Sequence, residues 1–193
     1  MKQELQEKLY KKYPKLFTQK DWSIRDSCMP WGIECGSGWY HILDKMCSLI
    51  QNDITYKRNA KANILRYNRA LQRAINGNTK YLEYHFKRFY KDPEELNKRI
   101  MQEMHVYSFL PDVNTTHQVQ FSQIKEKYGT LRVYANYASD FAEGVIDMAC
   151  SMSSITCEQC GMPGKMRGAF WYYVSCDEHA NPEDKDSEDE DQE

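Results

Sequence analysis

Residues 118–137, QVQFSQIKEKYGTLRVYANY, decide the fold class. Apolar and polar residues alternate on both sides of Tyr128-Gly129-Thr130, which is the pattern of two strands joined by a tight turn. The alternating apolar residues are Val119, Phe121, Ile124, Leu131, Val133, Ala135 and Tyr137. The sequence therefore predicts a β-hairpin in this stretch.

Apolar residues at helical spacing predict helices elsewhere. The predicted helices cover residues 2–13, 39–75, 79–90, 93–104 and 139–153, and the second is either one helix or two that meet near residue 53. Asp92-Pro93 is a strong start signal, with Asp92 as the N-cap. We expect Tyr81, Leu82, Phe86 and Phe89 on one side of their helix, and Phe141, Val145, Ile146 and Ala149 facing inward. Since most helices precede the hairpin, we predict an α+β fold rather than a doubly wound sheet.

Three cysteines and one histidine have the spacing of a structural zinc site, Cys157-x2-Cys160, fifteen residues, then Cys176-x2-His179. Each short turn points two ligands at one centre. Four protein ligands leave no open coordination position, so we expect a structural Zn²⁺. The alternative is that these cysteines are small apolar side chains packed for other reasons. Seven cysteines without a secretory signal do not predict a disulfide framework.

The cysteines also indicate how the chain is divided. Gly161, Gly164 and Gly168 allow turns, and residues 169–174, AFWYYV, favour a strand, so residues 155–180 predict a zinc-ribbon-like module. Residues 181–193 are strongly acidic and predict a disordered tail. The remaining body, residues 1–154, contains a basic helical insertion at about residues 56–104.

Positive charge is concentrated in that insertion. From residue 57 to residue 99 there are twelve Lys and Arg against four acids. Candidate residues for binding a nucleic acid or a protein partner are Arg58, Lys61, Arg66, Arg69, Arg73, Lys87 and Arg88. Tyrosines lie among them, and such a mixture can hold phosphates and stack bases. A protein-binding face and a plainly solvated helix are the alternatives.

A second candidate region is Glu34-Cys35-Gly36-Ser37-Gly38-Trp39, which leads into a helix. A glycine-rich turn before a helix can bind an anion, or can simply permit a tight entry with Trp39 in the core. If this turn meets the hairpin, a pocket is expected from Glu34, Cys35, Trp39, Lys125 and Arg132. Cys35 is then either a nucleophile or a buried thiol.

Three blocks of the sequence resemble a family of small uncharacterised proteins from tailed bacteriophages and prophages. The blocks are Glu34-Cys35-Gly36-x-Gly38-Trp39-Tyr40 with Leu43-Asp44, then QIKEKYGTLRVY at residues 123–134, then Cys157-Glu158-x-Cys160-Gly161-x-Pro163-Gly164 with Cys176-Asp177-Glu178-His179-Ala180. The resemblance covers roughly half of the chain and leaves out the basic insertion. It implies a phage origin and a zinc site, and it implies no activity.

These observations give three functional expectations. The first is a zinc-stabilised phage accessory protein that binds a host or phage macromolecule, in host takeover or counter-defence. The second is a nucleic-acid-binding protein that uses the basic, aromatic helices. The third is an enzyme with its pocket near Glu34, Cys35, Lys125 and Arg132. The charged N-terminus is not a signal peptide and no apolar run could cross a bilayer, so we expect the host cytoplasm and no membrane partner.

Overall fold

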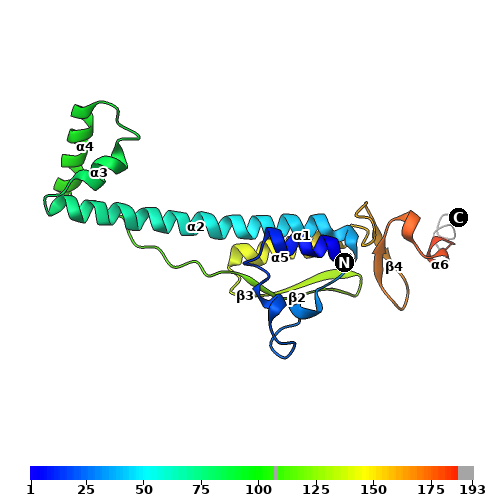
Figure 1. Cartoon of the computed structure of the whole chain (residues 1–193). Coiled ribbons are helices and arrows are strands. Elements are labelled where there is room, and N and C mark those ends of the chain that lie inside the picture. The colour runs from blue at the N-terminus through cyan, green and yellow to red at the C-terminus, as the bar shows by residue number, and fades with distance from the viewer. Residues whose placement is uncertain (107, 187–193) are drawn as a thin grey trace. The chain divides into compact units, whose positions relative to one another are not determined.

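The computed structural model describes residues 1–106 and 108–186, and it confirms a mixture of helices and strands (Figure 1). The chain divides into two compact units. The first, here called the core unit, contains Met1–Ile54 and the chain from His117 on. The second, the helical unit, contains Thr55–Thr116. Helix α2 (Tyr40–Ile75) is a single continuous helix that contributes residues to both units.

The core unit is built on a three-stranded sheet of β1 (Ile33–Glu34), β2 (Gln120–Lys127) and β3 (Thr130–Asn136). The predicted hairpin is confirmed, because β2 and β3 pair antiparallel through a two-residue turn. Both turn residues have positive φ, 55° at Tyr128 and 77° at Gly129, as tight hairpin turns require. Strand β1 adds in parallel on the other side of β2.

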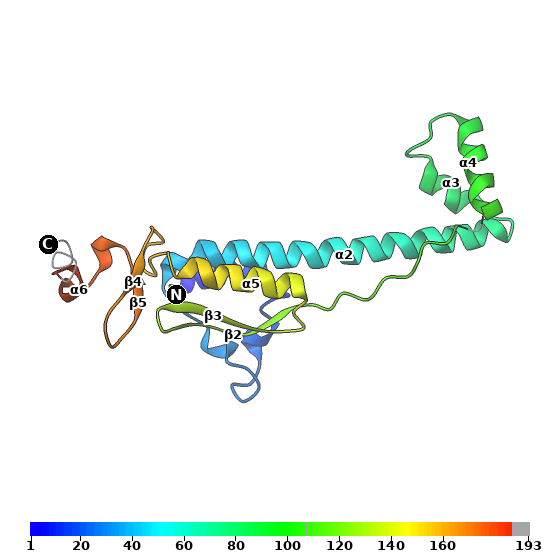
Figure 2. The same cartoon turned by 180° about the vertical axis from the view of Figure 1, so that it is seen from behind.

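Helices cover one face of this sheet. Figures 1 and 2 show α5 (Asp140–Ser153) and the first part of α2 along the β2–β3 hairpin, with α1 (Gln3–Lys12) beside them. Ser139 caps α5 by accepting a hydrogen bond from the N–H of Ala142. The inward position predicted for Phe141 is wrong, since its side chain is about half exposed. The buried core includes Leu9, Phe17, Trp39, Leu43, Met46, Ile124, Leu131, Val145, Ile146 and Ala149.

The segment between α1 and α2 carries short 3₁₀ turns at Thr18–Asp21, Met29–Trp31 and Ser37–Trp39. This segment also forms hydrogen bonds with backbone groups of β2. The N–H of Phe121 donates to the carbonyl oxygen of Leu16 at 2.9 Å, and the N–H of Cys28 donates to that of Ser122 at 3.1 Å. The edge of β2 that extends beyond the short strand β1 is therefore not left open to solvent.

The helical unit adds α3 (Lys80–Phe86) and α4 (Pro93–Val106) to the second part of α2. The predicted N-cap is confirmed, because Asp92 Oδ2 accepts a hydrogen bond from the N–H of Glu95 at 2.9 Å. The helix predicted over residues 79–90 is shorter than expected, and Tyr81 and Phe89 are exposed. This unit has its own buried core, made of Tyr67, Ala70, Leu71, Ala74, Leu82, Phe86 and Ile100.

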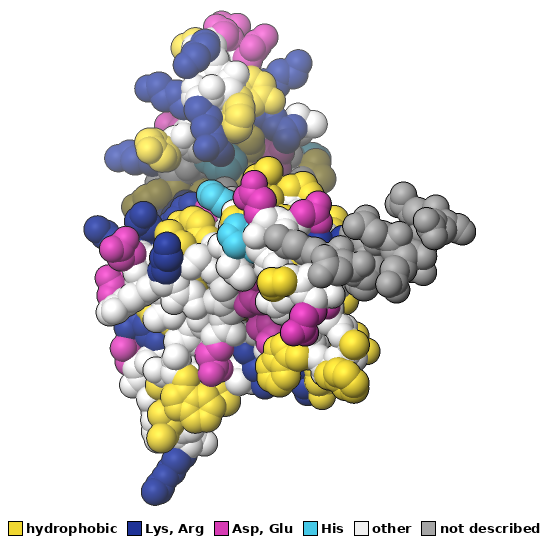
Figure 3. All heavy atoms as spheres, turned by 90° about the vertical axis from the view of Figure 1, so that its right-hand side faces the viewer, with side chains coloured by type: hydrophobic (Ala, Val, Ile, Leu, Met, Phe, Trp, Pro, Cys, Tyr) yellow, Lys and Arg dark blue, Asp and Glu magenta, His cyan; other side chains and the backbone are white. Residues whose placement is uncertain are grey.

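The C-terminal module contains an antiparallel pair, β4 (Lys165–Arg167) and β5 (Tyr173–Ser175), then a 3₁₀ turn at Asp177–His179 and α6 (Pro182–Asp186). The strand predicted over residues 169–174 starts only at Tyr173. Phe170 and Trp171 lie in the connection and are exposed. Figure 3 shows hydrophobic side chains at several places on the face of the molecule that it draws. A disordered tail is predicted over residues 181–193, but Pro182–Asp186 form α6, whose first turn carries the acids Glu183 and Asp184. Residues 187–193 lie outside the described residues.

Candidate functional site

The four predicted metal ligands come together at one point. Their ligand atoms, on Cys157, Cys160, Cys176 and His179, all lie within 4.8 Å of one another. The Sγ atoms of Cys160 and Cys176 are 3.7 Å apart, and His179 Nδ1 lies 3.1 Å from Cys176 Sγ. A tetrahedral ion with Zn–S bonds of ~2.3 Å requires sulfur atoms about 3.8 Å apart. The cluster therefore fits a four-coordinate metal ion, and it is the only such group found in the described part of the chain.

The first pair of ligands lies on a turn that favours the thiolate form. Gly161, which the sequence places in a turn, has a positive φ of 80°, and its N–H donates to the carbonyl oxygen of Cys157 at 2.9 Å. Burial opposes ionisation of Cys157, but the N–H groups of Cys160, Cys176 and Gln159 outweigh it and lower the pKa of this thiol to about 7. The thiolate is the form that binds a metal ion.

The glycine-rich turn at residues 34–39 packs against the turn that carries Cys157 and Cys160. The N–H of Gly36 donates to Glu158 Oε1 and the N–H of Gly38 donates to the Glu158 carbonyl oxygen, both at 2.7 Å. A Cβ atom on Gly38 would lie 2.3 Å from the carbonyl oxygen of Cys157, so only glycine allows this approach. The sequence left open whether the turn binds an anion or only permits a tight entry. In the structure its N–H groups hold Glu158, a carboxylate of the chain itself.

Trp39 and Glu158 fasten the metal-binding turn to the core. Trp39 is fully buried, and its indole N–H donates to the carbonyl oxygen of Thr156 at 2.8 Å. Burial raises the pKa of Glu158, the N–H of Gly36 acts in the opposite direction, and the charge of Glu126 raises it further. The contact joins residues that are more than a hundred positions apart in the chain, so the metal cluster is tied directly to the start of α2.

The second half of the module is held by polar side chains around β4 and β5. Arg167 is almost completely buried and forms an ion pair with Asp177, the residue that follows the ligand Cys176. The hydroxyl of Tyr173 donates to Asp184 Oδ2 at 2.5 Å and accepts from the N–H of Asn181 at 2.9 Å. These bonds fix the chain on both sides of the second ligand pair.

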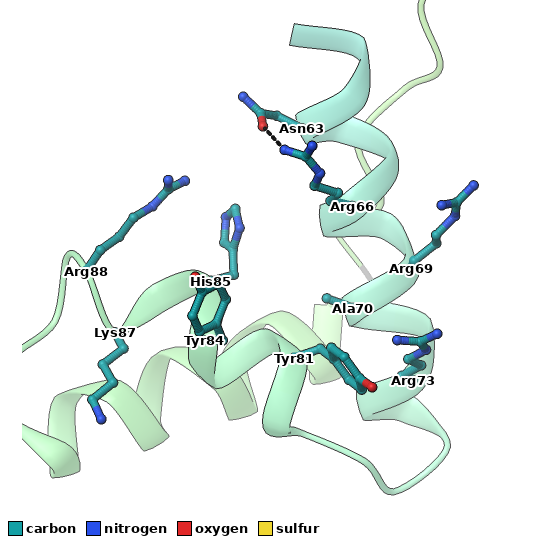
Figure 4. Close-up of a pocket in the computed structure, with 10 residues that line it drawn as sticks. All are labelled: Asn63, Arg66, Arg69, Ala70, Arg73, Tyr81, Tyr84, His85, Lys87 and Arg88. Carbon is teal, nitrogen blue, oxygen red and sulfur yellow. Dashed lines mark hydrogen bonds between the residues drawn. The ribbon is translucent and has the colours of Figure 1, made fainter. Parts of the chain in front are cut away.

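A second candidate site is a cavity of about 730 Å³ in the helical unit (Figure 4). Arg66, Arg69 and Arg73 come from α2, where their spacing of three and four residues places them on one face of the helix. The other wall is α3 with the residues that follow it. The lining residues are Asn63, Arg66, Arg69, Ala70, Arg73, Tyr81, Tyr84, His85, Lys87 and Arg88.

The cavity is strongly basic. It is lined by five Lys and Arg side chains and no Asp or Glu. Arg66 donates to Asn63 Oδ1 at 3.3 Å, and the Arg73 guanidinium lies 4.3 Å from the ring centroid of Tyr81. Within the described residues, none of the five cations forms an ion pair with a carboxylate. Their charge is therefore available to an anionic ligand.

A buried polar cluster contacts His85, one of the residues that line the cavity. Glu103 is only 5% exposed, and its carboxylate accepts from the Tyr67 hydroxyl and pairs with Arg99. Burial raises the pKa of Tyr67, and Glu103 raises it further. The ring of Tyr67 is in turn 5.3 Å from His85, which lines the cavity. Burial and then Arg88 lower the pKa of His85, while Glu103 opposes them.

The structure sorts the seven predicted basic residues into two groups. Arg66, Arg69, Arg73, Lys87 and Arg88 line the cavity. The other two contact the chain that leaves the helical unit, since Arg58 Nε donates to the Thr116 carbonyl oxygen at 3.2 Å and Lys61 Nζ donates to Thr115 Oγ1 at 3.0 Å. From the sequence, tyrosines were noted among these cations, but neither Tyr81 nor Tyr84 was named as a candidate, and His85 was not considered. The available signal was the spacing of three and four residues from Tyr81 to Tyr84 and His85, and of four and three residues from these two to Arg88.

The residues of the expected third pocket are brought together only in part. Glu34, Lys125 and Arg132 are direct neighbours across the three strands. Cys35 and Trp39 belong to the buried core instead. Burial raises the pKa of Cys35 to about 12, which keeps the thiol protonated and unsuited to nucleophilic attack.

No protein-family model matches the chain, and no curated protein or solved structure matches it. Among the described helices, none combines the length and the apolar character that crossing a bilayer requires.

Proposed function

We propose that this protein binds nucleic acid through the basic cavity of its helical unit, while a structural Zn²⁺ staples its C-terminal module to the core. The observation that carries the proposal is the convergence of five cations without ion-pair partners in the described part of the chain, three from α2 and two from the residues after α3, on one cavity that no acid lines. A nucleic-acid backbone matches this group of positive charges, because each phosphate that a Lys or Arg contacts releases a condensed counterion and so contributes to affinity.

The zinc assignment is supported by the donor set and its geometry. Three thiolates and one imidazole are typical ligands of structural zinc, and the separation of 3.7 Å between two of the sulfur atoms suits a tetrahedral ion. The two ligand pairs flank the short β4–β5 pair, an arrangement that supports a zinc-ribbon-like module. When bound, the ion would hold the module in its folded form. Glu158, which follows the ligand Cys157, would join it to the turn at Gly36 and Gly38.

A salt titration of binding tests the proposal. Anisotropy of a fluorescein-labelled oligonucleotide gives the affinity of the full chain over a range of salt concentrations. Substituting Arg69→Gln and Lys87→Gln removes one cation from each wall of the cavity. We expect the slope of log affinity against log salt to fall by about 1.4 to 1.8, since each lost phosphate contact removes about 0.7 to 0.9.

The matched control is the pair Lys80→Gln and Lys98→Gln, which removes the same charge from exposed positions of the helical unit outside the cavity. We expect the control to keep the slope of the unmodified protein to within a few tenths. An equal loss in both double variants would mean that only net charge matters. That result, or a lack of any binding by the unmodified protein, would reject the cavity as a nucleic-acid site.

A protein partner is the second candidate, and the exposed connection between β4 and β5 favours it. Phe170, Trp171 and Tyr172 are adjacent and exposed, and exposed aromatic side chains are enriched at protein interfaces. Together with the phage-like motifs, this supports an accessory protein that acts on a host or phage assembly in the host cytoplasm. A partner that is captured after nuclease treatment, and is lost in the Trp171→Ser variant, would support this role.

A further inference from the structure

The cavity contains two tyrosine rings that the fold itself does not use. Tyr84 is 85% exposed and Tyr81 is 51% exposed, and both line the cavity among the cations. In the described structure neither hydroxyl has a hydrogen-bond partner. Tyrosines with a structural role in this protein behave differently, since Tyr13 and Tyr67 bury their rings and bond their hydroxyls to Asp44 and Glu103. An aromatic ring held in water beside a row of arginines is suited to a ligand with flat faces.

The arrangement of rings and cations matches a strand whose bases are unpaired. Arg66, Arg69 and Arg73 follow one wall, Lys87 and Arg88 follow the other, and the tyrosines come from α3 (Figure 4). The guanidinium of Arg73 covers the Tyr81 ring at 4.3 Å from its centroid, which fixes that ring in place. The highly exposed ring of Tyr84 is the one left open for a base.

A duplex offers no free base face that could stack on the tyrosine ring. Its bases stack on one another, so a protein reaches their edges in the grooves and its phosphates, but not their faces. In a single strand every base has an accessible face, and stacking on an aromatic side chain tolerates any sequence. From this we infer that the cavity binds single-stranded nucleic acid, with the backbone on the arginines and a base stacked on Tyr84. The inference rests on the proposed function and names its ligand class.

The test compares three probes of about 15 nucleotides, a length that suits single-strand sites. They are an intact single strand, the same strand without bases, and the corresponding duplex. We expect the full chain to bind the intact strand at least roughly tenfold more tightly than the other two. Tyr84→Ala should weaken binding of the intact strand by about tenfold and leave the base-free strand unaffected, while Tyr84→Phe should retain the affinity.

The matched control is Tyr56→Ala, another exposed tyrosine of the helical unit that does not line the cavity. The inference is overturned if Tyr56→Ala and Tyr84→Ala have equal effects, if the base-free strand binds as tightly as the intact one, or if the duplex is preferred. In each of those cases the protein still binds a phosphate backbone, so the proposed function is not affected and is decided by the salt titration of the two double variants. If the unmodified protein binds none of the three probes, the proposed function fails and the inference fails with it.

Discussion

The C-terminal module and the helical unit treat polar side chains in opposite ways. In the module the functional groups face one another, as four ligands around one centre and as Arg167 on Asp177. In the helical unit the cations of the cavity face solvent, and Glu103 of the same unit is buried and already bound to Tyr67 and Arg99. Groups that satisfy one another within the chain stabilise the fold. Groups held apart without partners are available to a ligand, which is why we assign structure to the first region and binding to the second.

The largest effect on stability is expected from substitutions that remove a metal ligand. We expect Cys157→Ser or Cys176→Ser to lose the metal ion and to destabilise the core unit by roughly 5 kcal/mol or more, because metal binding contributes directly to folding. Metal content of the purified protein and its thermal unfolding measure the two effects. The control is Cys28→Ser, a cysteine outside the cluster. A variant that kept one zinc per chain would contradict the ligand assignment.

A smaller effect is expected from the turn that receives the metal-binding segment. Gly38→Ala places a methyl group against the Cys157 carbonyl oxygen, so we expect a loss of about 3 kcal/mol in the free energy of unfolding. Gly144→Ala is the matched control, since nothing lies within 4 Å of its Cβ position on α5. That substitution should stabilise the protein by about 0.5 to 1 kcal/mol. Denaturant unfolding checks both, and equal effects would contradict the tight contact.

The smallest of the three effects is expected for a substitution in the helical unit, and it tests whether this unit and the metal site are independent. Glu103→Ala leaves Tyr67 and Arg99 without their partner, and we expect this unit to lose roughly 2 kcal/mol. Hydrogen exchange in α3 and α4 should quicken while the metal content stays at one ion per chain. Loss of zinc from this variant would show that the two regions do not act separately.

Local patterns predicted local structure well. The alternation around Tyr128-Gly129 gave the hairpin, Asp92 gave the start of α4, and the cysteine spacing gave the ligand set. Each of these depends on interactions between residues that are close in the sequence or on a motif with fixed geometry. Such patterns can be recognised without knowing what the rest of the chain does.

Long-range contacts could not be predicted in the same way. Nothing in the sequence indicates that Gly36 and Gly38 receive Glu158, because that contact depends on how distant segments pack. The same limit explains two exposed side chains: Phe141 lies on the solvent side of α5, and Phe89 lies beyond the end of α3. For the cavity, composition indicated the cations, but only the packing of α2 against α3 shows that the tyrosines share it with five of them.

The way the chain enters and leaves the helical unit has a consequence for engineering. The core unit ends at Ile54 on one side of the helical unit and resumes at His117 on the other. Close to these two junctions, the side chain of Gln118 donates a hydrogen bond of 3.1 Å to the side chain of Gln51. Segments whose ends meet at neighbouring positions of a host can be excised or exchanged with little damage to it. The 62 residues of Thr55–Thr116 can therefore be treated as a cassette. Replacing them with a short linker should leave a metal-binding core, onto which other binding modules can be grafted at the same junction.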